Sequence, residues 1–480
     1  MKLSELIAVE KDVEIKGIVT DSRKVRRGDL FICIEGEKSD GHKYVKEAIA
    51  RGAVAIITEK CLGTDIEIRV PDTHRAAASL FSAWYREPQK SLDVIGVTGT
   101  NGKTSVSAML NAIYREAGVK TALFGTLGLW VGDDREESDN TTPLPEVLYR
   151  KLAEAKEKRV RRVVMEVSSH ALATHRTAEI PFHSAIYTNL TQDHLDYHKT
   201  MQNYAQAKLM LFRQSQCGIY NYDDPYSYYA SQVSPCEGYG YGQKRGCDFR
   251  ITKRDLHEFS SIGYAFSHQG IMRNVSCGVF GEFHVYNTLA AVSTAMIDGV
   301  EFDIIDRALQ KFRGVKGRGE IIFREPFVVM LDYAHTPDAL YSILTVLKEH
   351  MNKRYRRLRV LFGCGGDRDR SKRPIMGHIA ELLADEVIVT SDNPRGETKS
   401  AIIADVLGGM DTHEFDNRIQ VIEDRREALE FAIDSSLEGD VLLIAGKGHE
   451  EYEIDRYGKR PFSERQILLE RLIARGYSIV

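Results

Sequence analysis

Hydrophobic residues along the chain form short unbroken runs, and these runs are separated by longer stretches of mixed polarity. Runs such as 53–57, 327–331 and 441–445 are apolar at every position. This pattern is typical of strands buried on both faces of a parallel sheet. The stretches between the runs, such as 105–117, predict helices, and that one ends at Gly118. Regular alternation of the two patterns predicts an α/β fold.

The alternation divides the chain into three expected domains. Residues 1–88 predict a small α/β unit with strands at 30–34 and 53–57, helices at 41–51 and 73–85, and a linker at 86–88. Residues 89–324 predict a mostly parallel central sheet. Residues 325–480 predict a doubly wound parallel sheet, with strands at 327–331, 358–362, 386–390 and 441–445.

The stretch Gly99–Thr104 follows an apolar strand and opens a helix. Backbone N–H groups, the helix dipole and the Lys103 ammonium would face one point, which predicts an anion cradle. The strict P-loop spacing requires glycine where Val97 stands, so the match is to a shorter variant. The alternative is a tight turn with a solvated lysine.

Glu166 and His194 lie at the carboxyl ends of two other expected strands, 160–167 and 185–188. Ligands collect at this edge of an open parallel sheet, so both side chains are expected near the phosphates, where a divalent metal belongs. Taken singly, an isolated glutamate is more often a surface residue, and an isolated histidine a core residue.

Lys208 shares one predicted helix face with Met201, Tyr204 and Leu211. A lysine on an apolar stripe loses charge by desolvation. Such a neutral amine near a metal can take up carbon dioxide as a carbamate. From the pattern alone, a lysine whose ammonium extends out to solvent is the more frequent outcome.

Polar loops follow the four expected C-terminal strands, at 332–335, 365–368, 391–397 and 446–450. Their concentration of Asp, Arg, His and Glu predicts a site on one sheet edge. Three further segments are candidates. The segment 20–29 could bind a phosphate or a uracil edge, or it could be a simple turn. Thr142 and Pro143 are expected to begin a helix. Asn287 could contact a base edge.

Composition narrows the classes of function. The 480 residues carry a formal net charge of −4, which argues against a nucleic-acid partner. No apolar stretch has membrane-spanning length, and the N-terminus lacks a signal-peptide pattern. The 7 cysteines contain no Cys-x-x-Cys, which is typical of reduced cytoplasmic thiols and excludes a zinc-site pattern.

Taken together, these motifs resemble the Mur ligase family over all three expected domains. The motifs that match in order are 99–104, Glu166, 188–194, Lys208, 317–320 and 332–335. Within the family, the segments 21–23, 140–143, 168–169 and 392–395 are most similar to the UDP-MurNAc-tripeptide synthetases. Two positions depart from the pattern: His284 stands where the family often has asparagine, and Thr174 where glutamine often contacts substrate.

The resemblance implies a cytoplasmic ATP-dependent ligase of peptidoglycan precursor synthesis. It would add meso-diaminopimelate to the D-glutamate carboxylate of UDP-MurNAc-L-Ala-D-Glu through an acyl phosphate. ATP would be a co-substrate and Mg²⁺ the cofactor. The enzyme would be a monomer that acts on small molecules, with no nucleic acid and no membrane insertion.

The resemblance also implies roles for single residues. The catalytic and metal-binding set is Lys103, Thr104, Glu166, His194 and carbamylated Lys208. The ATP-binding set is Gly99, Thr100, Asn101, Gly102, Lys103, Thr104, Ser105, Asn287, Arg318, Asp332 and His335. The UDP-substrate set is Ser22, Asn140, Thr141, Thr142, Ser168 and Arg176. The diaminopimelate set is Arg368, Asp392, Asn393, Pro394, Arg395, Gly446 and Glu450.

Several alternatives remain at this stage. A lysine-adding ligase or a folylpolyglutamate synthetase-like ligase would use the same chemistry. A close analogue of diaminopimelate such as lanthionine shares its terminal groups. A nucleic-acid-dependent ATPase would need a basic track, and a regulatory nucleotide-binding module would not need Lys208, Glu166 and His194 together.

Overall fold

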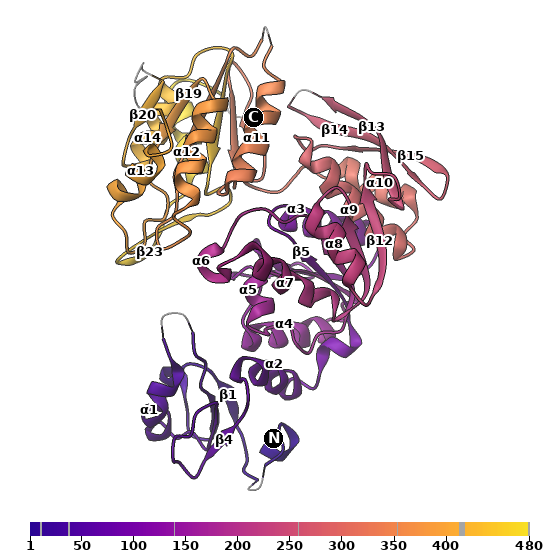
Figure 1. Cartoon of the computed structure of the whole chain (residues 1–480), viewed down its shortest axis with the longest axis vertical. Coiled ribbons are helices and arrows are strands. Elements are labelled where there is room, and N and C mark those ends of the chain that lie inside the picture. The colour runs from indigo at the N-terminus through magenta and orange to yellow at the C-terminus, as the bar shows by residue number, and fades with distance from the viewer. Residues whose placement is uncertain are drawn as a thin grey trace.

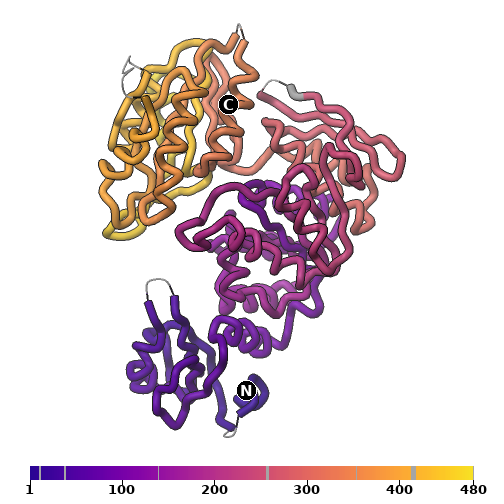
Figure 2. Tube along the Cα trace, viewed as in Figure 1, coloured from indigo at the N-terminus to yellow at the C-terminus, as the bar shows by residue number. Residues whose placement is uncertain are grey.

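Three α/β regions follow one another along the chain, and the first and last lie at opposite ends of the molecule (Figures 1 and 2). The structure is a computed structural model, and it describes residues 1–9, 12–36, 39–138, 140–257, 259–352, 354–411 and 418–478. None of the helices within those ranges is long and apolar enough to cross a bilayer. The expected α/β class is confirmed.

The first region holds a parallel sheet with strand order β1-β2-β3-β4. Strands β2 and β3 are buried at every position, as their apolar runs predict. The elements are η1 (Leu3–Glu5), β1 (Gly17–Val19), η2 (Ser22–Lys24), β2 (Asp29–Ile32), η3 (Gly41–Tyr44), α1 (Val45–Ala50), β3 (Ala55–Thr58), β4 (Glu67–Arg69), α2 (Thr73–Trp84) and η4 (Pro88–Ser91).

The second region holds the long sheet, whose order is β15-β14-β13-β12-β11-β10-β5-β9-β6-β7-β8. The strands from β13 to β6 along this order pair in parallel, and both ends of the sheet are antiparallel. The central strand β5 (Asp93–Thr98) leads through residues 99–102 into α3 (Lys103–Glu116). The sheet is therefore mostly parallel around the glycine-rich loop, as expected.

The remaining elements of this region are β6 (Thr121–Gly125), β7 (Gly128–Val131), β8 (Asp134–Glu136), α4 (Pro145–Glu157), β9 (Arg162–Glu166), α5 (Ser169–Ala173), β10 (Phe182–Tyr187), α6 (Leu195–His198), α7 (Met201–Phe212), β11 (Ser215–Asn221), α8 (Pro225–Val233), β12 (Glu237–Gly242), β13 (Phe249–His257), β14 (Ser261–His268), β15 (Ile271–Cys277), α9 (Phe283–Ile297) and α10 (Phe302–Lys311).

The helix expected to begin at Thr142 and Pro143 begins later, and that prediction is wrong. Helix α4 starts at Pro145, with Leu144 in extended conformation before it. The Thr142 hydroxyl is used elsewhere: it donates to the Glu166 carbonyl (2.9 Å) and accepts from the Ser168 amide (2.9 Å). A side chain bound to a neighbouring strand cannot cap its own helix.

The third region holds a sheet of order β16-β17-β21-β18-β19-β20. Helices cover both faces, because α11 to α13 contribute to one buried cluster, and α14 and α15 to another. The doubly wound arrangement agrees with expectation, but β16 pairs antiparallel to β17. The sheet is thus not wholly parallel. Apolar runs predict buried strands, but they do not indicate the direction of an edge strand such as β16.

Its elements are β16 (Glu320–Phe323), β17 (Val328–Asp332), α11 (Pro337–Glu349), β18 (Arg357–Phe362), α12 (Lys372–Leu383), β19 (Glu386–Val389), α13 (Lys399–Leu407), β20 (Ile419–Val421), α14 (Arg425–Asp434), β21 (Asp440–Ala445), β22 (Tyr452–Asp455), β23 (Gly458–Pro461) and α15 (Glu464–Ala474).

Candidate active site

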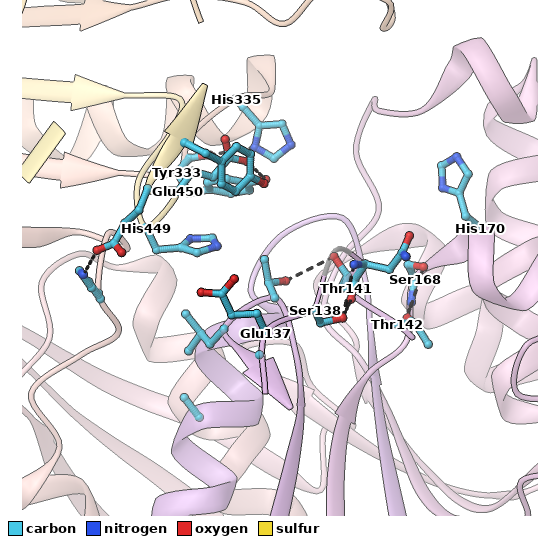
Figure 3. A pocket seen from close by; sticks show the side chains of 18 of the residues that line it. Glu137, Ser138, Thr141, Thr142, Ser168, His170, Tyr333, His335, His449 and Glu450 are labelled. Atoms are coloured by element: carbon cyan, nitrogen blue, oxygen red, sulfur yellow. Dashed lines mark hydrogen bonds and ion pairs between the residues drawn. The ribbon is translucent and has the colours of Figure 1, made fainter. Parts of the chain in front are cut away.

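An open cavity of about 1690 Å³ is lined by residues from all three regions. Residues 34–36 and His74 line it from the first region. Loops after β6, β9 and β10 line it from the second, and loops after β17, β18, β19 and β21 from the third. In Figure 3, Tyr333, His335, His449 and Glu450 lie across the open space from Thr141, Thr142, Ser168 and His170. Strand ends of two parallel sheets therefore meet at one place.

The glycine-rich loop lies behind the cavity wall. Within the described chain, none of residues 99–105 lines the cavity. Gly99 and Gly102 have positive φ values of 148° and 87°. A Cβ atom would collide with the Thr188 hydroxyl at Gly99 and with the Asn287 side-chain oxygen at Gly102. Both positions therefore require glycine for the close approach of two strand ends and α9.

Lys103 and Lys208 meet at this loop. Lys103 Nζ donates to the carbonyls of Gly99 and Thr100, each at 2.9 Å, and Lys208 Nζ donates to the Gly99 carbonyl at 2.8 Å. Lys208 is 1% exposed, and its ammonium lies 4.5 Å from the Tyr204 ring centroid. The lysine is thus held inside the protein and does not extend to solvent.

The positive charge of these lysines is disfavoured. Burial lowers the pKa of Lys208 well below its ordinary value, and the ammonium of Lys103 adds to this effect. Burial also lowers the pKa of Lys103, against the attraction of Glu166. Two amines that share one carbonyl and lie close together therefore favour a state in which one amine is uncharged.

Glu166 lies at the end of β9, and three donors hold its carboxylate. Thr104 Oγ1 donates to Oε2 at 2.9 Å, while Thr126 donates from its amide to Oε1 at 2.9 Å and from its hydroxyl to Oε2 at 3.0 Å. The first turn of α3 and the loop after β6 are thereby tied to the end of β9. Arg318 joins from the third region, since its Nη2 donates to Thr104 Oγ1 at 3.3 Å.

His194 adopts a left-handed backbone conformation (φ 54°) just before α6. Its Nε2 lies 3.3 Å from Asp193 Oδ2, and the same carboxylate lies 3.8 Å from His335 Nε2 and 3.8 Å from Lys372 Nζ. Desolvation in the wall of the cavity lowers the pKa of His194 to about 3. The ring is therefore neutral at physiological pH, as metal ligation requires.

The donor set beside the loop fits a magnesium ion. Thr104 and Glu166 supply a hydroxyl and a carboxylate 2.9 Å apart, the hard oxygen ligands that Mg²⁺ prefers. In the described ranges, the one cluster of three or more His, Cys, Asp or Glu side chains within ligand distance is Glu35, Asp40 and His42. There, Lys60 Nζ already lies 3.0 Å from Glu35 and 2.9 Å from Asp40. A magnesium ion at Thr104 would therefore depend on ligands from a bound substrate as well.

The remaining expected nucleotide-binding residues surround the loop. Asn287 is buried beside Gly102, and its Nδ2 lies 3.4 Å from His284 Nδ1. Asp332 accepts from the amides of Gly319 (2.6 Å) and Ala334 (2.7 Å). Ser105 is buried on α3, and the Asn101 side chain donates to Asp338 Oδ2 at 2.9 Å, across to α11. His335 Nδ1 lies 2.8 Å from the Tyr333 carbonyl.

Most of the expected UDP-substrate residues line the cavity, namely Asn140, Thr141, Thr142, Ser168 and Arg176. Arg176 Nη1 donates to the Thr142 carbonyl at 2.9 Å, and burial lowers the pKa of its guanidinium. Ser22 lies apart from them: it is buried in η2, and its hydroxyl donates to Glu47 Oε2 at 3.1 Å. The structure thus brings five of the six residues together.

The four C-terminal loops meet, as the pattern of strands and helices predicts. Arg368, Asp392, Asn393, Arg395, Gly446 and Glu450 all line the cavity. Arg395 Nη1 donates to two carbonyls, Gly366 (2.9 Å) and Asn393 (3.3 Å). Pro394 is set back from the cavity, where its carbonyl packs directly on Gly366.

The two arginines of these loops form a region of positive charge. In the part of the chain that the structure describes, no carboxylate lies within 4.0 Å of either guanidinium. Burial lowers the pKa of Arg395, and the neighbouring Arg368 lowers it further. Two neighbouring guanidiniums that no carboxylate contacts directly are suited to a carboxylate ligand, although the charges of Asp392 and Glu450 act on Arg395 from further away.

Acidic and amide groups lie beside that positive charge. Glu450 Oε2 accepts from Asn393 Nδ2 at 2.9 Å, and Asn393 Oδ1 accepts from Lys447 Nζ at 2.9 Å. Burial and the nearby Asp392 raise the pKa of Glu450. A carboxylate destabilised in this way gains most from a cationic ligand such as an ammonium group.

Some residues of the site were not among the expected ones. Lys447 is fully buried and donates a hydrogen bond to the Asn393 amide oxygen. The Asp193 carboxylate lies close to His194, His335 and Lys372. Tyr333 packs against Gly448 of a neighbouring loop. Lys447 and Tyr333 lie within motifs that the sequence singled out. Their roles depend on contacts between distant segments, which a single sequence does not display.

Comparison with known proteins identifies relatives over the whole chain. Three family descriptions match: the Mur ligase family catalytic domain at residues 14–85, the Mur ligase middle domain at residues 97–295, and the Mur ligase glutamate ligase domain at residues 317–448. The UDP-N-acetylmuramoyl-L-alanyl-D-glutamate–2,6-diaminopimelate ligase of Syntrophomonas wolfei subsp. wolfei is 44% identical over 491 residues, covering 98% of this chain and 99% of that protein. The Bacillus velezensis protein of the same name is 41% identical, covering 92% and 91%.

Solved structures show the same architecture. A structure of a UDP-N-acetylmuramoyl-L-alanyl-D-glutamate–2,6-diaminopimelate ligase superimposes with a TM-score of 0.69 and 31% identity, covering 100% of both chains. Folylpolyglutamate synthase of Mycobacterium tuberculosis, complexed with ADP, gives a TM-score of 0.66 at 17% identity, covering 84% of this chain and 95% of that one. The second likeness concerns the fold alone.

Proposed function

This chain belongs to the Mur ligase family, and from that premise we propose that it joins meso-diaminopimelate to the D-glutamate carboxylate of UDP-MurNAc-L-Ala-D-Glu. The coupling is driven by ATP and serves peptidoglycan precursor synthesis. The names of the full-length relatives support the substrate pair. The domains correspond to residues 1–88 for the UDP-substrate, 89–324 for ATP and 325–480 for the amino acid.

The observation that carries the substrate assignment is the charge pattern in the C-terminal loops. Arg368 and Arg395 present positive charge without a carboxylate partner in the described chain, and Glu450 and Asn393 lie beside them in the same cavity. The distal end of diaminopimelate carries one carboxylate and one ammonium group, which match these two sets. Lysine lacks the distal carboxylate, so it would leave the guanidiniums unpaired.

The first chemical step activates an acid. The substrate carboxylate oxygen attacks the γ-phosphorus of ATP, the bond to the β-phosphate oxygen breaks, and ADP leaves with its electron pair. Lys103 and the amides of the 99–104 loop would hold the phosphates, with Asn287, Arg318, Asp332 and His335 around the nucleoside. Catalysis of such a transfer consists mostly of positioning and charge stabilisation.

The second step forms the amide bond. The amine of the amino acid attacks the acyl carbon, inorganic phosphate leaves, and the nitrogen loses one proton. Arg176, Ser168 and residues 140–142 would hold the UDP-substrate so that its carboxyl group faces both partners. The cavity brings the proposed UDP-substrate residues and amino-acid residues together, and His335 lines it from the proposed nucleotide set, while residues 99–105 lie behind its wall.

Magnesium belongs to the proposal as the cofactor. Thr104, Glu166, His194 and a carbamate on Lys208 would hold it, and the ion would neutralise phosphate charge. Carbamylation would convert the buried amine of Lys208 into an anion. The nearby Lys103, which disfavours a positive charge at this position, would then attract the group on Lys208. The proposed use of ATP and a UDP-linked substrate supports a cytoplasmic location, which is part of the proposal. The monomeric state stays a prediction.

Measurement of phosphate release with purified protein tests the proposal. ATP, magnesium and UDP-MurNAc-L-Ala-D-Glu are supplied with meso-diaminopimelate, L-lysine or lanthionine in separate reactions, and a further reaction supplies ATP, magnesium, a folate-type substrate and L-glutamate. We expect phosphate to appear in step with a product whose mass has increased by diaminopimelate minus water. Faster coupling of lysine would assign the chain to the lysine-adding ligases, and coupling of glutamate to a folate-type substrate would replace the proposal.

A further inference from the structure

Tyr333 lies between the two groups of loops that the proposed reaction must coordinate. It follows β17 directly, and Figure 3 shows its side chain next to Glu450, His449 and His335. The ring centroid is 4.5 Å from that of His335 and 5.0 Å from that of His449. The half-buried ring is in contact with both histidines, so its face and its hydroxyl are both available as contacts in the cavity.

The ring face contacts the nucleotide side. The guanidinium carbon of Arg318 lies 4.0 Å from the Tyr333 ring centroid, a cation–π distance. Arg318 Nη2 in turn donates to Thr104 Oγ1 at 3.3 Å, and Thr104 donates to Glu166 at 2.9 Å. The ring therefore supports an arginine that reaches the first residues of α3.

The hydroxyl contacts the amino-acid side. Tyr333 Oη donates to Glu450 Oε1 at 3.3 Å, while the other oxygen of Glu450 accepts from Asn393. The two donors together set the plane of the carboxylate in the cavity. Burial raises the pKa of the Tyr333 hydroxyl, so it remains a donor at physiological pH.

Backbone packing makes these contacts dependent on each other. Gly317, next to Arg318, and Gly448, two residues before Glu450, are pressed together: a Cβ at Gly317 would collide with the Gly448 backbone, and a Cβ at Gly448 would lie 2.8 Å from Tyr333 Cβ. Both glycines have positive φ, 67° and 55°. A shift of the loop that holds Gly317 or of the loop that holds Gly448 would therefore also displace Tyr333.

We propose that Tyr333 is a positioning residue that couples nucleotide binding to amino-acid binding, by holding Arg318 on its ring face and Glu450 through its hydroxyl. The proposal rests on the proposed function, since it takes ATP and an amine-bearing amino acid as the two ligands. It assigns the ring of Tyr333 to the ATP side of the site and its hydroxyl to the amino-acid side. The two halves can be removed separately.

The variants Tyr333→Phe and Tyr333→Leu separate these contributions. The first removes the hydroxyl and keeps the ring, so we expect the KM for diaminopimelate to rise roughly tenfold, while the KM for ATP and the kcat change less than twofold. The second removes the ring as well, so the KM for ATP should rise too. Tyr355→Phe is the matched control: Tyr355 is a buried tyrosine of the same region outside the cavity lining, and its variant should keep both KM values.

A merely structural role would produce a different result. In that case Tyr333→Phe would lower the melting temperature and raise both KM values together, or leave both unchanged, and either result overturns the proposal. Should Tyr333→Leu fail to fold, the split between the two KM values in Tyr333→Phe decides alone. Wild-type protein that releases no phosphate with any amine refutes the proposed function, whereas active wild-type protein with an unaltered Tyr333→Phe variant refutes only the role of Tyr333.

Discussion

Lys208 is the residue at which local sequence and tertiary context diverge most. Its position on an apolar helix face leaves two outcomes open: an ammonium that extends to solvent, or one that is buried. The structure buries it, with Nζ on the Gly99 carbonyl and 1% exposure. The backbone carbonyl that accepts it comes from a loop over a hundred positions away in sequence, and so the outcome depends on the packing of α7 against that loop.

The variant Lys208→Ala tests whether this amine acts in catalysis. We expect kcat to fall about 10²- to 10³-fold, because the charge stabilisation of the phosphoryl transfer is lost. If the amine acts as a carbamate, a short carboxylic acid such as formate can enter the vacated space and supply the missing anion, so added formate should restore part of the activity. Steady-state phosphate release with and without formate measures both effects.

Lys151→Ala is the control for that variant. Lys151 is also a buried lysine, but it pairs with Glu136 and Glu154 away from the cavity. Its removal should lower stability while kcat stays near wild type and shows no response to formate. Wild-type activity of Lys208→Ala would exclude Lys208 from the mechanism.

Arg395 is expected to carry the preference for a second carboxylate. In Arg395→Ala we expect kcat/KM for diaminopimelate to fall about 10²- to 10³-fold, since a desolvated charge pair is lost, while the weak coupling of lysine changes far less. Parallel kinetics with both amino acids measure the change in preference. Arg370→Ala removes an exposed arginine that pairs with Asp405 nearby and should leave the preference intact. An Arg395→Ala enzyme with unaltered kcat/KM would contradict the assignment.

At the scale of elements, strand ends determine where the chemistry collects. β5, β9 and β10 pair side by side in parallel, as do β17, β21, β18 and β19. Their carboxyl ends lie at one edge of each sheet, so loops that are far apart in sequence become neighbours. The helices that follow contribute their N-termini to the same edges. This is why short polar loops after apolar runs were sufficient to locate the C-terminal loops of the cavity lining.

The contact between Gly317 and Gly448 joins two such loops, and Gly317→Ala tests it. Left-handed φ costs a non-glycine residue about 1–2 kcal/mol, and the collision with the Gly448 backbone adds to that. We expect a lower free energy of unfolding together with a higher KM for ATP, measured by chemical denaturation and by kinetics.

Gly299→Ala separates strain from collision. Gly299 also has a positive φ of 80°, but no atom lies within 4 Å of where its Cβ would be. This variant should lose about 1 kcal/mol of stability and keep its KM for ATP. If both variants behave alike, the approach of the two loops has no role in nucleotide binding.

At the scale of the whole molecule, the three regions are tied together by different means. Leu80 of α2 and Leu148 of α4 belong to one buried cluster, so the first and second regions share a core. The second and third regions share an apolar cluster through Phe259 and Phe280, and polar pairs such as Asn101 to Asp338 join them beside the glycine-rich loop. Polar contacts are exchanged with water at little net cost, which suits a boundary that must admit substrates.

Buried histidines contribute to the pH dependence of overall stability, and His284 is one of them. His284 is 3% exposed, and burial lowers its pKa to about 3, with the charge of Arg318 adding to the effect. Protonation therefore favours the unfolded chain, where the pKa is near 6.5. The free energy of unfolding should be highest above pH 6.5 and should fall as the pH drops towards 3, by up to about 1.4 kcal/mol per pH unit from this group.

His284→Asn isolates that contribution, because the amide does not titrate. Between pH 7 and pH 5 the free energy of unfolding of this variant should decline less steeply than that of the wild type, measured by urea denaturation at each pH. Equal slopes for the two proteins would mean that folding does not lower the pKa of His284.

The sequence by itself determined the fold class, the order of elements and the chemistry of the site. Buried parallel strands need apolar runs, glycine is needed where a positive φ coincides with a close backbone approach, and phosphate, metal and carboxylate ligands need particular side chains. Each of these demands is met within a short segment, so each is visible without a structure. The same local signals were misleading at Thr142, whose hydroxyl binds a neighbouring strand, and at β16, whose direction depends on its partner.

Only the tertiary structure decided which segments meet. The burial of Lys208, the sharing of Asp193 by three side chains, the placement of Ser22 away from the cavity, and the position of Tyr333 between two loops all depend on contacts between distant segments. Such contacts follow from how sheets and helices pack, and packing is a property of the whole chain. A side chain's type is local, whereas its partner, its burial and its pKa are set by the fold around it.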